Sequence, residues 1–187
     1  MTEKEHFLEL CARVKREGMD DLLAWLEKSD FFYAPASTRF HGACPGGLLM
    51  HSLNVYNELE RLLAAYPEVE VPEESAIIAA LFHDVCKVGL YTSEKRNRKN
   101  EHGQWESYDA YKVEEKFCYG GHGSKSVFIL QNYIKLTPDE AVAINAHMGP
   151  WDGNTNVGSA YEQRPFAWLV HVADEAATYI REGKHGT

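Results

Sequence analysis

Leu81-Phe82-His83-Asp84-Val85-Cys86-Lys87 is the stretch around which the rest of the chain is organised. It places a histidine and an aspartate side by side at the end of an apolar helical run, residues 76–85. Burying an ionisable pair is costly unless something binds it, and a divalent metal would satisfy both side chains at once. Adjacent helical residues point about 100° apart. Both can therefore reach one ion only near a helix end, where Gly89 puts this pair. Lys87 lies one turn after His83, where it could meet a substrate anion held by the metal.

Further histidine and aspartate residues outside this stretch stand where a helix would hold a ligand rigidly. His51 falls on the inward stripe of a helix predicted for residues 46–65, and the apolar members of that stripe are Leu48, Val55, Leu59 and Leu62. Three more candidates precede, line or end later predicted helices: His122, His147 and Asp174.

Each of these residues has a simpler interpretation when it is taken alone. His51 could be a hydrogen-bonded core residue, and His122 could be a loop residue between two glycines. His147 could face the terminal carbonyls of its helix, and Asp174 could be a buried partner for a basic residue. The joint pattern favours metal ligation, because five core-facing or helix-end positions carry His or Asp without an obvious local salt-bridge partner.

Hydrophobic periodicity predicts an all-α fold with one minor β element. Helices are predicted at residues 2–17, 19–28, 46–65, 73–88, 121–134, 137–148 and 165–181, and Thr137, Pro138 and Glu140 carry the signature of a capped helix start. The polar and aromatic segment 90–120, with a turn at His102-Gly103, predicts a β-hairpin or structured insertion of the kind that often forms a lid or pocket wall. Residues 29–47 and 149–164 are predicted to be irregular. We expect one domain over residues 1–187, with a core at about 40–180 and helices within residues 1–30 packed on it.

The charge balance is acidic, with 28 Asp and Glu residues against 19 Lys and Arg residues. This argues against broad nucleic-acid binding, and we interpret the basic run at residues 95–99 as a solvated loop tip. The four cysteines show no CxxC spacing, so we expect reduced thiols in a cytoplasmic protein. Cys86 and Cys118 could be metal ligands, but buried thiols are the favoured interpretation. With no signal-peptide pattern and no apolar run near 18 residues, we expect no membrane span.

The ordered set of candidate ligands resembles that of the HD-domain superfamily of metal-dependent phosphohydrolases, over about residues 40–179. The set is His51, His83, Asp84, His122, His147 and Asp174. The run Pro45-Gly46-Gly47-Leu48-Leu49-Met50-His51-Ser52-Leu53-Asn54-Val55 is especially similar to the HD domain of a bacterial 3′–5′ exoribonuclease family. The doublet alone is a weak signal, whereas the ordered set is specific. One departure is that the usual apolar residue and glycine before the lysine are Val85 and Cys86 here.

The resemblance implies an HD-domain-like helical bundle with a first metal held by His51, His83, Asp84 and Asp174. Subfamilies with two extra histidines hold a second metal, with the aspartate of the doublet as a bridge, and His122 and His147 match those positions in order. A mixed imidazole and carboxylate set suits Mn, Fe, Ni, Co or Zn better than Mg or Ca. The expected cofactor is therefore one or two divalent transition-metal ions.

The function implied is cleavage of a phosphoester of a nucleotide or short oligonucleotide by a metal-activated water. Asp84 and Lys87 would be the catalytic residues, with Lys87 stabilising the charge that develops on the phosphate oxygens. Arg39, His41 and Trp151 are candidate substrate contacts. A surface-loop role for Arg39 and a packing role for Trp151 are the alternatives.

Two other functions fit the same ligands. The first is an HD-type di-iron oxygenase, which uses a similar set of six and would be distinguished by iron content and oxygen uptake. The second is an HD domain that binds a nucleotide or a partner without turnover, and the complete ligand set argues against it.

Overall fold

The computed structural model describes residues 1–153 and 156–183 of the chain. It is mostly helical with one antiparallel hairpin, which confirms the predicted fold class. The η elements are 3₁₀ turns, except for η3, which is a single π-helical turn. In chain order the elements are α1 (Glu3–Ala12), α2 (Met19–Lys28), α3 (Gly47–Ala65), α4 (Glu73–Phe82), η1 (Val85–Lys87), β1 (Tyr91–Lys99), β2 (Trp105–Val113), α5 (His122–Leu130), α6 (Pro138–Ala146), η2 (Gly149–Asp152), α7 (Val157–Gln163), α8 (Pro165–Ala176) and η3 (Ala177–Arg181).

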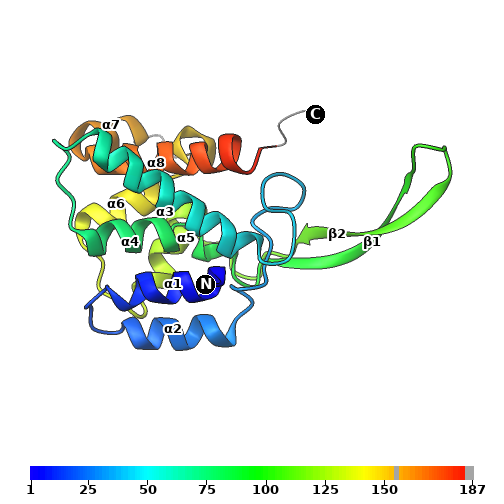
Figure 1. Ribbon diagram of the computed structural model, residues 1–187, viewed down its shortest axis with the longest axis horizontal. Coiled ribbons are helices and arrows are strands. Elements are labelled where there is room, and N and C mark those ends of the chain that lie inside the picture. Colours follow the sequence, from blue (N-terminus) through cyan, green and yellow to red (C-terminus); the bar gives the residue numbers. More distant parts are fainter. Residues whose placement is uncertain (154–155, 184–187) are drawn as a thin grey trace.

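The centre of the bundle is formed by α3, α4, α6 and α8, which pack on one another. Helices α1 and α2 lie along one side of the bundle, and α7 and α8 lie along the opposite side (Figure 1). The ring of Phe7 in α1 lies 5.8 Å from the ring of Phe82 at the end of α4, and 5.2 Å from that of Phe31. These aromatic contacts join the N-terminal helices to the helix that precedes the His-Asp pair.

Helix α4 ends at Phe82, earlier than the predicted boundary at residue 88. Its residues from Ser75 to Phe82 are all buried, so it is a core helix rather than a surface helix with one apolar stripe. Asp84 has φ −107° and ψ 18°, which takes the chain out of the α-helix and into η1. Gly89 then turns the chain away from the core at φ +65°. The His-Asp pair therefore stands at a helix end, as the sequence predicted.

The predicted hairpin is present as β1 and β2, paired from Tyr91 with Val113 to Lys99 with Trp105. Its turn includes the expected His102-Gly103, and the Gly103 N–H donates to the carbonyl of Asn100 at 2.9 Å. The hairpin projects from one side of the helical bundle (Figure 1). Most of its residues are therefore exposed, and its base is the part that meets the bundle.

Two other sequence predictions were wrong. Helix α1 ends at Ala12 and not at residue 17. The segment predicted as a loop at 149–164 contains η2 and α7 in its described part, while residues 154 and 155 lie outside the described residues. No residue of α7 is buried, so hydrophobic periodicity gave no signal there. The Tyr161 hydroxyl of α7 donates to the carbonyl of Ala146 at 2.9 Å, which holds α7 against the end of α6.

The start of α6 follows the sequence signature closely. The Thr137 side chain accepts from the Glu140 backbone N–H at 3.2 Å, and the Glu140 carboxylate accepts from the Thr137 N–H at 2.8 Å. Glu140 is fully buried and also accepts from Arg16 and Ser75. The predicted capping box is confirmed, and it positions the helix that ends at His147.

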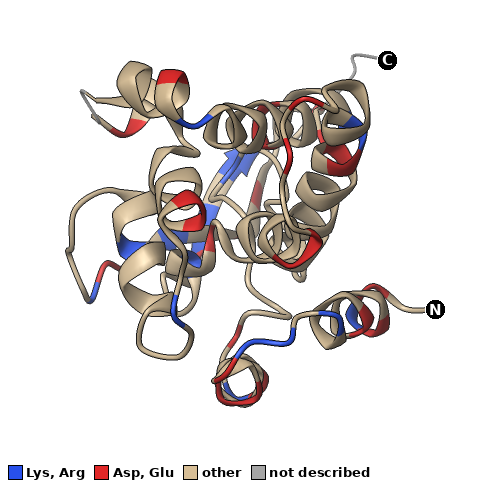
Figure 2. Ribbon diagram, turned by 90° about the vertical axis from the view of Figure 1, so that its left-hand side faces the viewer, with Lys and Arg blue, Asp and Glu red and all other residues tan. Residues whose placement is uncertain are grey.

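Charged residues of both signs are interspersed over the helices in the view of Figure 2. The basic run at 95–99 lies on β1, where Lys95 pairs with Asp109 at 2.8 Å and Arg98 pairs with Glu106 at 2.6 Å. It is therefore an exposed strand with acidic partners and not a loop tip. The four cysteines are free, and Cys118 is exposed, contrary to the expectation that it is buried. None of the described helices is long and apolar enough to cross a membrane.

Candidate metal centre

Three helices bring the four expected ligands of a first metal together. His51 comes from α3, His83 and Asp84 follow α4, and Asp174 comes from α8. The Nε2 atom of His51 lies 3.1 Å from Oδ1 of Asp174 and 3.3 Å from Nε2 of His83. The Oδ2 atom of Asp84 lies 3.3 Å from Nε2 of His83. All four side chains are buried, so their polar atoms face one another and not solvent.

In His51, His83 and His147, Nδ1 already has a hydrogen-bond partner, which leaves Nε2 directed at the cluster. His83 Nδ1 donates to the carbonyl of Ala80 at 2.9 Å, and His147 Nδ1 donates to the carbonyl of Ile144 at 2.7 Å. Because a carbonyl oxygen can only accept, each of these two rings carries its proton on Nδ1 when it is neutral, and its Nε2 offers a lone pair. This is the usual arrangement of a metal-binding histidine.

The electrostatics of the cluster favour a cation at its centre. Burial opposes charging of the His51 ring, but hydrogen bonds to Asp174 and Glu182 outweigh it and raise the pKa of His51 to about 9. Burial alone would raise the pKa of Asp84, but Lys87 and His83 hold it well below its usual range. The centre thus contains ionised carboxylates facing imidazole nitrogens, a donor set that fits a divalent transition metal.

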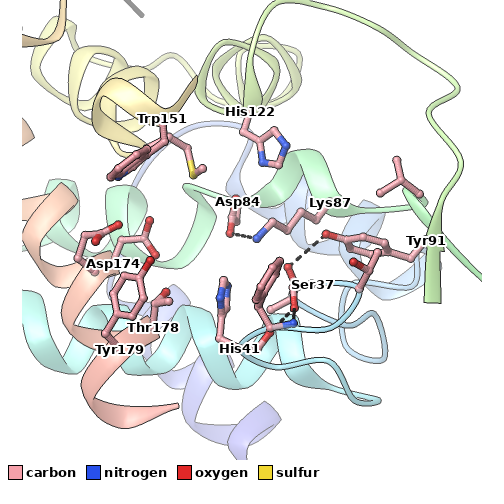
Figure 3. Close-up of a pocket in the computed structure, with 16 residues that line it drawn as sticks. Ser37, His41, Asp84, Lys87, Tyr91, His122, Trp151, Asp174, Thr178 and Tyr179 are labelled. Carbon is pink, nitrogen blue, oxygen red and sulfur yellow. Dashed lines mark hydrogen bonds and ion pairs between the residues drawn. The ribbon is translucent and has the colours of Figure 1, made fainter. Parts of the chain in front are cut away.

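Lys87 lies against Asp84 rather than free in solvent. Its Nζ atom is 2.6 Å from Oδ2 of Asp84, and both side chains are almost fully buried. Burial opposes the charge of Lys87, but Asp84 outweighs it and raises the pKa of the lysine. The ammonium group is therefore positively charged, and it borders the cavity described below (Figure 3).

His147 and His122 approach Asp84 as parts of two different groups. Ligand atoms of His83, Asp84 and His147 all lie within 4.8 Å of one another, and so do those of Asp84, Cys86 and His122. Of the described residues, no single group of this kind contains both His122 and His147. Asp84 is the residue that the two groups share.

Glycines around His122 allow this approach. A Cβ atom at Gly123 would lie 2.4 Å from the carbonyl oxygen of Asn145, so only glycine lets the start of α5 pack against the end of α6. This packing brings His122, the first residue of α5, near the junction after α4.

A cavity of about 420 Å³ opens above the cluster (Figure 3). Asp84, Lys87, His122 and Asp174 line its deep part, and the residues that line the rest include Ser37, Phe40, His41, Tyr91, Val113, Met148, Trp151, Glu175, Thr178 and Tyr179. Tyr91 and Val113 are the first and last residues of the hairpin strands, so the base of the insertion forms part of the wall.

The candidate substrate contacts divide into two that line the cavity and one that does not. Trp151 lines it with 74% of its surface exposed, and the ring of His41 lies 4.7 Å from that of His51. Arg39 is absent from the wall. It is exposed, and its guanidinium lies over the ring of Phe40, which does line the cavity.

Sequence reasoning missed two residues that position the histidines. Oε1 of Glu182 lies 3.1 Å from Nδ1 of His51 and accepts a hydrogen bond from Asn54 at 2.9 Å. His171 donates from Nδ1 to the carbonyl of His147 at 2.7 Å. His171 precedes Asp174 by three residues on α8, a helical spacing that could have revealed it. Glu182 lies one residue beyond the predicted end of the last helix and gave no such signal.

Residues 48–179 match the family model of the HD domain. The chain belongs to the HD domain family. The matched span contains all six candidate ligands. Members of this family bind divalent metals, and the buried His and Asp groups of this chain could hold such an ion.

One curated relative of this chain is a phosphodiesterase. Dihydroneopterin 2′,3′-cyclic phosphate phosphodiesterase of Methanocaldococcus jannaschii is 28% identical over 153 residues, which cover 80% of this chain. The chain spans about half of that relative, 53% of its length. A comparison with solved structures gives no significant match. The narrower resemblance to the exoribonuclease HD domain is not supported by these comparisons and stays a prediction.

Proposed function

We propose that this HD protein is a metal-dependent phosphodiesterase that cleaves a small nucleotide-like phosphoester with a metal-activated water. The observation that carries the proposal is the junction after α4. There, Oδ2 of Asp84 lies 3.3 Å from Nε2 of His83 and 2.6 Å from the charged Nζ of Lys87, and Asp84 and Lys87 both line an open cavity. A metal site and a fixed positive charge beside it are what phosphoryl chemistry requires.

His51, His83, Asp84 and Asp174 are the proposed ligands of the first ion, and His122 and His147 are the further candidates. Bound there, a divalent ion would supply a Lewis acid for a phosphate oxygen and a hydroxide near neutral pH. The fixed Nδ1 hydrogen bonds of His83 and His147 keep their Nε2 atoms aimed at the ion without rearrangement.

Lys87 is the proposed anchor for the phosphate. It is the only lysine or arginine among the described residues that line the cavity. A single ammonium group beside Asp84 and Asp174 suits one phosphate group better than a triphosphate, because additional negative charge would face carboxylates. In the reaction it would stabilise the charge that develops on the equatorial oxygens.

The organic part of the substrate would lie against the aromatic mouth of the cavity. Phe40, Trp151 and Tyr179 line it, with between 67% and 74% of each side chain exposed. Exposed aromatic faces can stack on a flat heterocycle. The relative acts on a cyclic phosphate of a pterin, a compound of that chemical class. A nucleobase or a similar ring joined to one phosphodiester is therefore the proposed substrate class.

His41 is proposed to contact the phosphate or the leaving group. Burial, together with the nearby His51 and Lys87, lowers the pKa of His41 to about 4. The ring is therefore neutral at pH 7, and its Nε2 atom is buried without a hydrogen-bond partner among the described residues. A neutral imidazole offers one N–H and one lone pair to a bound substrate. Arg39 does not line the cavity, so it would contact the substrate only outside it.

The direct test is a comparison of phosphodiesters and phosphomonoesters with protein purified without chelator. We expect release of product from 2′,3′-cyclic and 3′,5′-cyclic nucleotides and from bis(p-nitrophenyl) phosphate. Chelation should abolish turnover, and one of Mn, Fe, Co, Ni or Zn should restore it. Nucleoside triphosphates should be poor substrates.

Iron content and oxygen uptake are measured in the same preparation. Oxygen consumption without phosphate-ester cleavage would replace the proposal with the di-iron oxygenase. Tight nucleotide binding without turnover under any of these metals would instead support the non-catalytic alternative.

A further inference from the structure

Cys86 stands at the position where the HD pattern has a glycine, and its sulfur faces the metal centre. It lies in η1, two residues after Asp84 and directly before Lys87, and it is 1% exposed. Its Sγ atom, a carboxylate oxygen of Asp84 and a ring nitrogen of His122 all lie within 4.8 Å of one another. A thiol, a carboxylate and an imidazole at such distances are three of the common ligands of a transition metal.

Unpartnered polar atoms surround this point. Of the described residues, Asp84 Oδ1, His122 Nδ1 and His147 Nε2 are buried atoms without a hydrogen-bond partner. His147 is fully buried, and its Nε2 atom lies 3.5 Å from Oδ1 of Asp84. Buried polar atoms are normally satisfied, so a cluster of unsatisfied ones calls for an explanation such as an ion.

The backbone holds Cys86 and His122 in a fixed relation. The Cys86 N–H donates to the Ser126 hydroxyl at 3.2 Å, which attaches η1 to α5. Ser126 lies four residues after His122, so the two residues share one face of α5. Cys86 and His122 are therefore presented to Asp84 by two elements that are bonded to each other.

We propose that Cys86 is a thiolate ligand of a second divalent ion, which it holds together with Asp84 and His122. The inference rests on the proposed metal-dependent function, because Asp84 then borders both ions. Binding replaces the thiol proton, which is released to solvent, with a metal–sulfur bond. A soft thiolate favours Zn, Fe(II) or Co(II) over Mn or Mg at this second position.

The competing explanation is that Cys86 is an inert buried thiol that fills space beside Ser126. Burial and the charge of Asp84 raise the pKa of the Cys86 thiol to about 12, so without an ion the group is protonated in either case. The two explanations differ only when a metal is present, and the test must therefore report on the sulfur–metal bond itself.

The experiment is a titration of the metal-free full-length chain with Co(II), followed by absorption spectroscopy. We expect two equivalents to bind and a thiolate-to-cobalt charge-transfer band in the near ultraviolet to appear with one of them. Cys86→Ser should lose the band and bind one of the two ions at least about 10–100-fold more weakly, the scale seen even for outer-shell changes. Two control variants should keep the charge-transfer band and the affinity for both ions. They are Cys11→Ser, a matched change at a buried cysteine outside the centre, and Cys118→Ser.

No charge-transfer band in the wild-type chain, or a band that persists in Cys86→Ser, would overturn the inference. Circular dichroism checks that the variant is folded, and Cys86→Ala carries the same test if the serine variant is not. The readout is independent of turnover. A band without phosphodiesterase activity would therefore reject the proposed function and keep the ligand, and activity without a band would do the reverse.

Discussion

Asp84 and Lys87 at the centre of the bundle form an ion pair whose side chains are 3% and 6% exposed, whereas Lys95 and Asp109 on the hairpin form one whose side chains are 66% or more exposed. The N–O distances are similar, 2.6 Å and 2.8 Å. The environments differ, because water screens the outer pair and protein surrounds the inner one. Two ion pairs with similar N–O distances can therefore differ in their effects. The central pair is expected to affect both the stability of the fold and the reaction.

The largest effect is expected when the negative charge of Asp84 is removed from the central ion pair. Asp84→Asn should lose metal from both proposed positions and reduce turnover to background. Asp84 lies 3.3 Å from Nε2 of His83 at the proposed first position and forms a group with Cys86 and His122 at the proposed second one. Metal content and turnover are measured together. Glu140→Gln is the matched control: Glu140 is also a fully buried carboxylate with a cationic partner, but it lies outside the centre. Full metal retention in Asp84→Asn would remove this aspartate from the ligand set.

Removing Lys87, the cation of the central pair, should reduce turnover more than it reduces metal binding. Lys87→Ala should retain metal and lose about 2–4 kcal/mol of transition-state stabilisation, or roughly 10²–10³-fold in turnover, by analogy with the loss of one oxyanion donor. Lys125→Ala, which breaks the ion pair with Glu115, is the control. Turnover that stays at the wild-type level in Lys87→Ala would show that the lysine does not act on substrate.

The pH dependence of stability can distinguish the centre from the surface. The folded-state pKa of His51 is raised from 6.5 to about 9, so its contribution is fully present below pH 6.5 and is lost as pH rises towards 9. In metal-free protein, the free energy of unfolding should fall across that window by a few kcal/mol, since each pKa unit is worth about 1.4 kcal/mol. Urea unfolding at several pH values measures this, and bound metal should suppress the decline. An increase in stability over this window in metal-free protein would contradict the assignment.

A smaller effect is expected at the carboxylate behind the first histidine. Glu182→Ala removes the acceptor at Nδ1 of His51 and should weaken metal binding by about 10–100-fold. Glu58→Ala is the control, because Glu58 pairs with Arg181 at the same end of the bundle without touching His51. Equal metal affinity in both variants would mean that Glu182 does not position the ring.

The smallest effect is expected on the hairpin. Lys95→Ala should change Tm by less than about 4 °C, because exposed ion pairs contribute roughly 0–1 kcal/mol and 1 kcal/mol corresponds to about 2–4 °C in a domain of this size. Thermal unfolding measures this directly. A larger decrease would show that the hairpin pairs carry more of the stability than their exposure suggests, and the comparison with the centre would weaken.

The same contrast explains what could be predicted from sequence. The helices that lead to His51, His83 and Asp174 have strong apolar patterns, so their positions followed from periodicity. The meeting of these candidate ligands was inferred from their joint pattern and from the resemblance to the HD superfamily. The short helix α7 buries no residue, and Arg39 lies outside the cavity because of how one irregular segment folds. Neither of these two features produces a hydrophobic periodicity in the sequence. The Lys87–Asp84 pair has the i, i+3 spacing that brings two side chains together on a helix, so it could have been predicted although α4 ends at Phe82.

The direction of the Glu182 side chain depends on the number of residues in the π-helical turn η3, near the end of the described chain. This wide turn is closed by the Glu182 N–H, which donates to the carbonyl of Ala177 at 3.0 Å, five residues back. Each residue of a helix advances the direction of the next by about 100°. A one-residue deletion within Ala177–Arg181 would therefore rotate Glu182 away from His51, whereas a substitution at the exposed Ile180 would leave the backbone path intact. Relatives with an insertion or deletion in this turn would orient the counterpart of His51 differently, even if all their candidate ligands were identical.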